Sequence, residues 1–210
     1  MHDAFVQDLI GKGVLYTDAV IAAFEKVRRP DFVHKQMLPD SYADAPLPIG
    51  YNQTISQPST VAIMLEHLRV EPGQRVLEVG CGSGWLTGLL AELVGASGFV
   101  YAIDILPEMV DLSEEHLRSY HFENVDVRCA DGWHGVPEHA PFNRIIVSAA
   151  AEEIPMALLE QLAREGRLVM PVGGDTQDLV VVTKGVDGKI QTEHHPGFQF
   201  VPLISRHLHA

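Results

Sequence analysis

Cysteine, basic residues and long apolar runs are all scarce in this chain of 210 residues. Its 2 Cys, Cys81 and Cys129, lack CxxC spacing, so we expect two free thiols in a reducing cytoplasm. Lys and Arg number 15 against 28 Asp and Glu, and the net charge of −13 disfavours nonspecific binding to nucleic acid or to an anionic membrane. No run approaches the ~20 apolar residues of a membrane helix, and nothing after Met1 resembles a signal peptide. With 46% hydrophobic and 20% charged residues, the composition predicts a cytoplasmic globular protein of one domain.

A glycine-rich turn lies between two apolar segments. Residues 75–79 are predicted to form a buried strand, and residues 86–94 an amphipathic helix. Glycine lets the backbone bend sharply and lets a ligand approach where a Cβ would block it, and the helix points its free N–H groups into the turn. The pattern fits either a nucleotide-type cofactor loop or a purely structural turn. The turn itself contains Gly80, Cys81, Gly82, Ser83 and Gly84.

A carboxylate at the end of the next predicted strand favours the cofactor interpretation. Residues 99–104 end in Asp104, about 20 residues past the glycines, where dinucleotide-binding folds place the acid that binds ribose. The last glycine of the dinucleotide fingerprint is missing, because Trp85 and Leu86 follow Gly84. The loop therefore favours S-adenosylmethionine over a cofactor that contains pyrophosphate.

Helical and extended patterns alternate along most of the chain. Alternation of this kind predicts an α/β fold with a mostly parallel sheet covered by helices on both faces. The end differs, because 179–184 and 189–194 flank a turn and predict an antiparallel hairpin, with 198–204 packing at the edge. Predicted helices lie at 3–10, 18–27, 58–68, 86–94, 107–119 and 155–163, and further strands at 125–129, 144–148 and 166–172.

Residues 30–58 are rich in proline and turn-forming residues. A structureless connection of this length is uncommon inside a compact domain. Its many apolar and aromatic residues also argue against a surface linker. We therefore expect a functional segment.

Polar side chains follow several predicted strands, at the edge where open α/β sheets bind ligands. Asp131 precedes Gly132 and fits either an acceptor for an adenine amino group or a simple Asp-Gly turn. Glu78 is an acid inside an apolar strand. It fits three roles: orienting the glycine loop, meeting a cofactor ammonium, or acting as a satisfied structural acid. Ser148 lies at a third strand end.

Several motifs resemble those of the protein-L-isoaspartate O-methyltransferases, in the same order from about residue 18. The most specific is Asp44-Ala-Pro-Leu-Pro-Ile-Gly-Tyr-Asn-Gln-Thr-Ile-Ser-Gln-Pro58, whereas the glycine loop is shared by many methyltransferases. The others are Val76-Leu-Glu-Val-Gly80, Asp131-Gly132, Ala140-Pro-Phe142 with Ile145-Ile-Val147, Ile154-Pro155, Gln161-Leu162, Gly166-Arg-Leu-Val169 and Phe200-Val-Pro-Leu203.

The resemblance implies a Rossmann-like class I methyltransferase fold and methyl transfer from S-adenosylmethionine to the α-carboxylate of L-isoaspartyl residues in damaged proteins or peptides. It divides the single domain 1–210 into N-terminal helices with a substrate-side segment (1–57), a cofactor-binding core (58–175) and a C-terminal hairpin and edge (176–210). Ser56 matches the serine usually designated as the active site. The implied cofactor-binding residues are Gln53, Thr54, Ile55, Glu78, Gly80, Cys81, Gly82, Ser83, Gly84, Asp104, Ile105, Asp131, Gly132 and, with looser alignment, Gln177.

The chain departs from the family pattern at a few positions. Asn52 stands where Gly or Ala is more usual, a change that bears on substrate preference. The remaining departures leave the cofactor assignment intact; they are Cys81, Trp85, Ala130 and Ser148.

Ser56 suits an acceptor that needs no strong general base. A carboxylate with a pKa of roughly 4 is already an anion at neutral pH, so the protein must chiefly align the reacting atoms and exclude water. We therefore interpret Ser56 as an orienting group. The alternative is a helix cap for the segment that starts at Pro58.

Other polar residues have weaker claims. Trp133 and His134 fit either pocket walls or ordinary packing, and Arg28-Arg29 are expected at a helix end, where their charge suits the dipole. A metal site is not expected, because no Cys or carboxylate spacing accompanies the C-terminal histidines. These are His194, His195, His207 and His209.

Three functions remain open from sequence. The first is repair of isoaspartyl residues; the second is methyl transfer to an ordinary aspartate in a specialised peptide-modification pathway. The third is a catalytically silent fold that binds the cofactor or a partner protein, and the Thr54-Ile55-Ser56 block argues against it.

Overall fold

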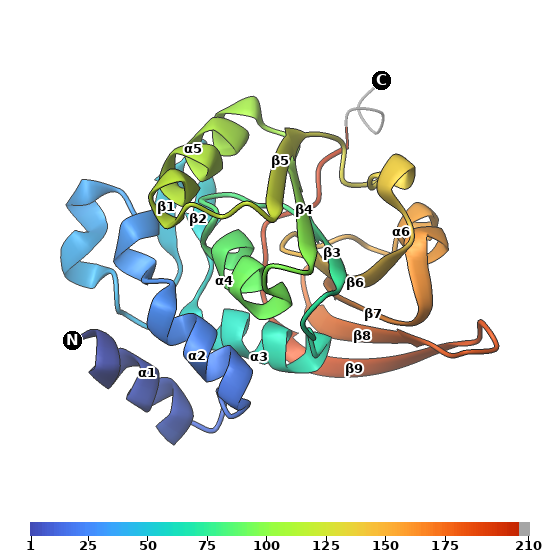
Figure 1. Cartoon of the computed structure of the whole chain (residues 1–210), viewed down its shortest axis with the longest axis horizontal. Helices are drawn as coiled ribbons and strands as arrows, with labels where there is room; N and C mark the ends of the chain where they lie inside the picture. The colour runs from blue at the N-terminus through green and yellow to red at the C-terminus, as the bar shows by residue number, and fades with distance from the viewer. Residues whose placement is uncertain (206–210) are drawn as a thin grey trace.

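Seven strands form one open sheet at the centre of the computed structural model, which describes residues 1–205 (Figure 1). They are β3 (Arg75–Val79), β4 (Phe99–Asp104), β5 (Val125–Cys129), β6 (Phe142–Val147), β7 (Leu162–Gly173), β8 (Gln177–Lys184) and β9 (Ile190–Phe198). Their order across the sheet is β5-β4-β3-β6-β7-β8-β9. The pairs from β5 to β7 are parallel, and β7-β8 and β8-β9 are antiparallel. The predicted parallel sheet and C-terminal hairpin are confirmed.

The strand order reverses at β3, which places a binding crevice. The chain proceeds from β3 outward through β4 to β5 and then returns to the other side of β3 with β6. In sheets of this kind, ligands bind beyond the carboxyl ends of the strands at such a reversal. The glycine turn 80–84 follows β3 and so lies at this point.

Both faces of the sheet are buried, as its near-continuous apolar strands require. Val76 and Ile146 belong to a core shared with the N-terminal helices and α4, whereas their neighbours Leu77 and Ile145 belong to a second core shared with α6. Because side chains alternate between the two faces of a strand, Glu78 lies on the same face of β3 as Val76 and points into the first core. The helices are α1 (His2–Gly11), α2 (Asp18–Lys26), α3 (Pro58–Leu68), α4 (Trp85–Val94), α5 (Pro107–Leu117) and α6 (Met156–Gln161).

The predicted residue ranges agree closely with the observed bounds of α3, β3, β4 and β5. They agree less well for elements later in the chain. The helix expected at 155–163 ends at Gln161, because the chain enters β7 four residues before the predicted 166 and pairs Leu162 with Phe142. The second hairpin strand continues to Phe198 through Pro196. Proline is tolerated there because β9 is the edge strand. The helix expected at 107–119 ends at Leu117 and continues as the short 3₁₀ turn η3 (Arg118–Tyr120).

The proline-rich segment 30–58 is ordered and is not a surface linker. It forms the 3₁₀ turns η1 (Arg29–Phe32) and η2 (Lys35–Asp40), then the hairpin β1 (Leu47–Gly50) and β2 (Gln53–Ile55). Tyr51 and Asn52 both have positive φ, which suits a two-residue turn of the hairpin type. Ile49 of β1 lies against the glycine turn, since a Cβ at Gly82 would be 3.5 Å from the Cδ1 of Ile49.

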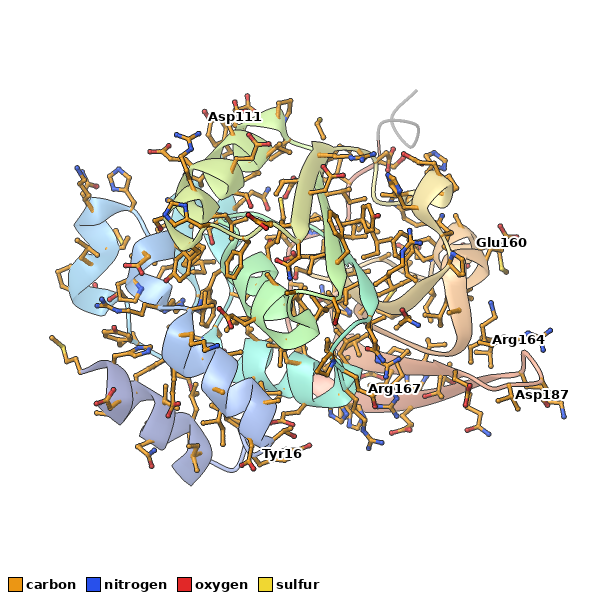
Figure 2. All side chains as sticks on the ribbon, in the orientation of Figure 1. Tyr16, Asp111, Glu160, Arg164, Arg167 and Asp187 are labelled. Atoms are coloured by element: carbon orange, nitrogen blue, oxygen red, sulfur yellow. The ribbon has the colours of Figure 1, made fainter. Side chains whose placement is uncertain are left out.

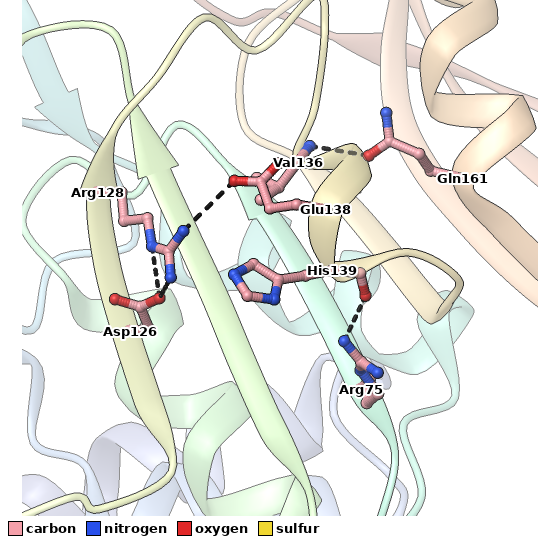
Figure 3. Close-up of polar contacts among 7 residues, drawn as sticks. All are labelled: Arg75, Asp126, Arg128, Val136, Glu138, His139 and Gln161. Atoms are coloured by element: carbon pink, nitrogen blue, oxygen red, sulfur yellow. Dashed lines mark hydrogen bonds and ion pairs between the residues drawn. The ribbon is translucent and has the colours of Figure 1, made fainter.

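The connection between β5 and β6 is held by polar contacts on the second face (Figure 3). Arg128 on β5 pairs with Glu138 at 3.4 Å, and Arg75 donates a hydrogen bond to the carbonyl of His139, both within or beside the 3₁₀ turn η4 (Pro137–His139). The buried side chain of Gln161 accepts the backbone N–H of Val136 at 2.8 Å, midway along this connection. These contacts fix the residues that follow Asp131.

Charged side chains lie over the outside of the molecule (Figure 2). Asp111 on α5 is exposed on one side of the view, and Glu160 on α6 and Arg164 are exposed on the other. No helix among residues 1–205 is both long enough and apolar enough to cross a membrane.

Glu66 on α3 ties the two N-terminal helices to the core. It is 6% exposed, and one of its carboxylate oxygens accepts the backbone N–H groups of Tyr16 and Thr17 at 2.8 Å each. These N–H groups precede α2 and have no partner inside that helix. Glu66 therefore acts as a cap supplied from another element.

Replacing Glu66 with alanine should lower the free energy of unfolding by about 1–3 kcal/mol, because both N–H groups lose a charged acceptor. Chemical denaturation followed by circular dichroism measures the change. Glu160→Ala, at an exposed position of α6, is the matched control and should change stability by less than about 0.5 kcal/mol. Equal effects of the two substitutions would contradict the capping role.

Candidate active site

One hollow lies beyond the carboxyl ends of β3, β4 and β6, with about 860 Å³ of empty space including the part open to solvent. Four separate stretches of chain form its walls: 53–56 from the hairpin, 79–83 from the glycine turn, 103–106 after β4 and 201–204 near the C-terminus. Further lining residues are Val61, Trp85, Leu86, Ala130, Gly132, Ser148 and Ala149. Eleven of the fifteen expected site residues line this hollow, and they are Gln53, Thr54, Ile55, Ser56, Gly80, Cys81, Gly82, Ser83, Asp104, Ile105 and Gly132.

The glycine turn is fixed against β4 by its own backbone. The N–H groups of Gly80 and Cys81 both donate to the carbonyl of Ile103, at 2.8 and 3.1 Å. Gly80 and Gly82 have φ of 86° and 51°, conformations that a side chain disfavours. Gly84 has another reason to be glycine, because a Cβ there would lie 2.6 Å from Oγ of Ser113 on α5. Gly84 therefore packs against α5 and does not line the hollow.

Asp104 is held at the end of β4 with acceptor capacity left over. Its Oδ2 accepts the N–H of Gly82 and its Oδ1 the N–H of Leu106, both at 3.1 Å. Burial raises the pKa of Asp104, and these backbone hydrogen bonds oppose the shift. Each carboxylate oxygen has a second lone pair, so Asp104 can also accept hydroxyl hydrogen bonds from a ligand in the hollow.

Glu78 lies beneath the glycine turn, fully buried and outside the walls of the hollow. Neither of its oxygens has a hydrogen-bond partner among the described residues, and the nearby Thr87 hydroxyl has none either. Burial raises the pKa of Glu78 to about 8, with Thr87 opposing the shift and Asp104 adding to it. The interpretation as a satisfied structural acid is therefore not supported. An unpaired buried carboxylate beside the hollow fits a ligand that carries positive charge.

Ser56 faces the hollow and does not cap α3. The N-cap residue is Gln57, without a side-chain cap bond. The N–H of Ser59 is instead bonded to Oδ1 of Asp44 at 2.9 Å. The capping alternative for Ser56 is therefore wrong, because an acid 15 residues earlier than Ser59 already supplies the acceptor.

Asp131 makes the turn that its Asp-Gly sequence predicts. Its Oδ1 accepts the N–H of Trp133 at 3.0 Å, and its Oδ2 accepts the hydroxyl of Ser205 at 2.8 Å. Gly132 does line the hollow, and a Cβ there would lie 2.4 Å from Val79. Indole Nε1 of Trp133 donates to the carbonyl of Leu203 at 3.3 Å. Ordinary packing of the C-terminal segment thus accounts for these contacts.

Gln177 anchors the C-terminal segment and lies in a second hollow, together with Trp133 and Glu152. Its Oε1 accepts the N–H of Phe200 at 2.7 Å, and its Nε2 donates to the carbonyl of the same residue at 3.3 Å. The four residues that follow Phe200 line the first hollow. This segment carries one of the family motifs, Phe200-Val-Pro-Leu203, but the sequence alone indicates no role for it in the site.

The histidine and arginine expectations meet different outcomes. His194 lies 3.3 Å from Asp178 on β8, and the His195 ring packs against His67 with centroids 4.2 Å apart. Within residues 1–205, no group of three or more His, Cys, Asp or Glu is arranged to hold a metal ion. His207 and His209 lie outside the described residues.

The expectation for Arg29 is wrong. Arg29 begins η1 and is completely buried, so its charge does not serve the dipole of α2.

Comparison with known proteins identifies relatives over the full fold. The family model described as protein-L-isoaspartate(D-aspartate) O-methyltransferase matches residues 1–208. A protein-L-isoaspartate O-methyltransferase from Methanocella arvoryzae is 45% identical over 183 residues, covering 87% of this chain and 97% of that one. One from Pyrococcus horikoshii is 44% identical over 204 residues, covering 96% and 92%. A Plasmodium falciparum structure, described as a protein-L-isoaspartate O-methyltransferase in complex with S-adenosyl-L-homocysteine, superposes with a TM-score of 0.87 at 26% identity, covering 97% of this chain and 98% of that one.

Glu78 predicts a specific pH dependence of stability in the ligand-free protein. Its pKa rises from 4.5 to about 8 on folding, so the folded state holds more protons between these values and stability falls as pH rises through that range. Glu78→Gln removes this loss and should raise the melting temperature at pH 8 by roughly 2–4 °C or more. Near pH 4.5 the difference should vanish. Thermal denaturation from pH 4.5 to 8.5 measures it; a difference independent of pH would contradict the buried carboxylate's titration.

Proposed function

The chain belongs to the protein-L-isoaspartate(D-aspartate) O-methyltransferase family, and we propose that it methylates the α-carboxylate of L-isoaspartyl residues in proteins and peptides, using S-adenosylmethionine. One observation carries this proposal. The hairpin stretch 53–56 and the glycine turn 80–83 belong to separate elements, with α3 and β3 between them in the sequence, and both face the same hollow. A donor site and an acceptor site can therefore share one chamber.

The lining residues fit the cofactor. The turn at Gly80 and Gly82 supplies backbone with no Cβ in the way, and the Asp104 carboxylate is oriented to accept ribose hydroxyls. Gly132 and Ala130 leave space for a flat ring. Burial raises the pKa of Glu78, which has no hydrogen-bond partner among the described residues, and a ligand with positive charge nearby would oppose that shift and favour its ionised form. When bound, the cofactor supplies an electrophilic methyl group on a sulfonium.

The side chains around the hollow suit an acceptor that is already an anion. Of the described residues that line it, the ionisable ones are Asp104 and Cys81. Burial raises the pKa of the Cys81 thiol far above its ordinary value, so it stays protonated at neutral pH. Neither group suits a general base, and a carboxylate with pKa of roughly 4 requires none.

Ser56 is the residue that we assign to the acceptor side. Its hydroxyl can donate a hydrogen bond to one oxygen of a carboxylate without competing for the methyl group. Thr54 and Gln53 extend the same wall. The task of these residues is to hold the acceptor in line and to exclude water, which supplies rate through positioning.

The substrate is an isoaspartyl-containing protein or peptide, and we infer that the enzyme meets it in the cytoplasm. Both cysteines lack a disulfide, as a reducing compartment favours. The net charge of −13 gives no support to a nucleic-acid substrate.

Transfer of labelled methyl from S-adenosylmethionine to a synthetic isoaspartyl peptide tests this function. The isoaspartyl peptide should be methylated, and its normal aspartyl twin should react at least about 100-fold more slowly, because its free carboxylate is the side-chain β-carboxylate, which lies in a different place relative to the backbone. Equal labelling of the twin would instead favour an aspartate-modifying enzyme. Cofactor binding by calorimetry without any labelling would favour a catalytically silent protein.

Ser56→Ala should reduce kcat by about tenfold or more, because a misaligned carboxylate reacts slowly, while the Kd for S-adenosylmethionine should change little. Steady-state kinetics and calorimetry measure the two effects separately. Ser119→Ala, an exposed serine on η3, is the control and should leave both unchanged. Wild-type kcat in Ser56→Ala would remove Ser56 from the acceptor site.

A further inference from the structure

Arg29 is a buried cation without an ion-pair partner among the described residues. The whole residue is 0% exposed, which places it among the largest fully buried side chains of the protein. Asp44 is the acid whose field acts on it, but burial dominates and lowers the pKa of Arg29 to about 10. A buried charge is costly unless hydrogen bonds compensate it. The compensation here comes from backbone carbonyls.

Four carbonyls surround the guanidinium, and they come from both sides of the β1–β2 hairpin. Nη1 donates to the carbonyls of Ser41 and Ala43 at 2.8 and 3.1 Å. Nη2 donates to those of Ala45 and Ser56 at 2.9 and 3.1 Å. The first three precede β1, and Ser56 directly follows β2. The guanidinium of Arg29 thus joins the two ends of the segment 41–56 and fixes them relative to each other.

The other side of Arg29 contacts the cofactor half of the molecule. Its guanidinium carbon lies 5.4 Å from the ring centroid of Trp85. Trp85 is the first residue of α4, directly after the glycine turn, and it lines the hollow. Its indole Nε1 donates to the carbonyl of Val27 at 3.3 Å, two residues before Arg29. Arg29 therefore lies between the Ser56 segment and the helix that carries the glycine turn.

We propose that Arg29 is a positioning residue for methyl transfer, whose guanidinium sets the place of Ser56 relative to the glycine turn. This inference rests on the proposed function, which puts the acceptor at Ser56. Arg29 itself does not line the hollow. It acts through the main chain of Ser56 and through the indole of Trp85.

Arginine is required because of its shape. A guanidinium presents donors in a rigid fork, whereas a lysine ammonium presents three donors from one atom. A lysine at position 29 keeps the charge but cannot reach all four carbonyls. Without the hydrogen bond from Arg29 to its carbonyl, Ser56 can shift. A displacement of about 1 Å can cost on the order of 100-fold in rate.

The test compares Arg29→Lys with Arg28→Lys, the same chemical change at the exposed neighbouring residue. Calorimetry with S-adenosylmethionine gives the Kd and the number of competent sites, and kinetics on the isoaspartyl peptide give kcat per competent site. For Arg29→Lys we expect kcat per site to fall about 10- to 100-fold, with the Kd changed less than about threefold. Arg28→Lys should match the wild type in both.

A purely structural Arg29 would give another result. Arg29→Lys would then melt at a lower temperature and yield fewer competent sites, but each site would turn over at the wild-type kcat, and this outcome overturns the proposal. Failure of the proposed function is separate, because the wild-type enzyme and Arg28→Lys would then also fail to label the peptide.

A second variant decides the matter if Arg29→Lys does not fold. Trp85→Phe leaves all four carbonyl bonds possible but removes the indole that packs on the guanidinium. Hydrogen exchange should become faster at the backbone amides of residues 41–57, a segment linked to Trp85 through Arg29. Unchanged exchange in that segment would overturn the proposal.

Discussion

The site depends on one pair of hydrogen bonds, from the N–H groups of Gly80 and Cys81 to the carbonyl of Ile103. This shared acceptor ties the turn after β3 to the end of β4, where the strand order allows a crevice to open. The turn can accept this geometry because Gly80 tolerates a φ of 86°. Asp104, one residue past Ile103, then bonds Gly82 from the same strand end. The donor side of the hollow is therefore built from adjoining backbone and needs few side chains.

The acceptor side has no such local construction. The stretch 53–56 belongs to a two-stranded hairpin that is not part of the main sheet, and a sheet of that size is marginally stable alone. Its place is set by two contacts outside the hairpin strands: Asp44 accepts the N–H of Ser59 at the start of α3, and the guanidinium of Arg29 donates to the carbonyl of Ser56. At the opposite wall, Gln177 clamps the backbone of Phe200. Long-range polar contacts thus supply what strand pairing supplies on the donor side.

This difference explains how far the sequence predicts the molecule. Apolar periodicity predicts α3, β3, β4 and β5 closely, because local spacing decides which side chains are buried. Glycine spacing and the strand-end acid Asp104 likewise indicate the donor side. Arg29 carries no comparable signal, because its four partners are backbone carbonyls that any residue would present. The contacts of Gln177 with Phe200, and the hydrogen bond from Ser59 to Asp44 that leaves Ser56 without a capping role, also join residues distant in the sequence, so local patterns do not reveal them.

The charge of the chain also indicates that the acceptor is held by short-range positioning and not by long-range electrostatic attraction. The chain carries a net charge of −13, so its long-range field repels the anionic acceptor that we propose, and salt screens that field beyond about 8–10 Å. Among the described residues, Asp104 is the one carboxylate that lines the hollow, and it already accepts two backbone N–H groups, so little negative charge inside the hollow opposes the acceptor. Short-range donors such as the Ser56 hydroxyl must then hold the acceptor, and hydrogen bonds of this kind are effective only at well-defined distances. A buried arginine that fixes main chain is costly to desolvate, but it provides the rigidity that this chemistry requires.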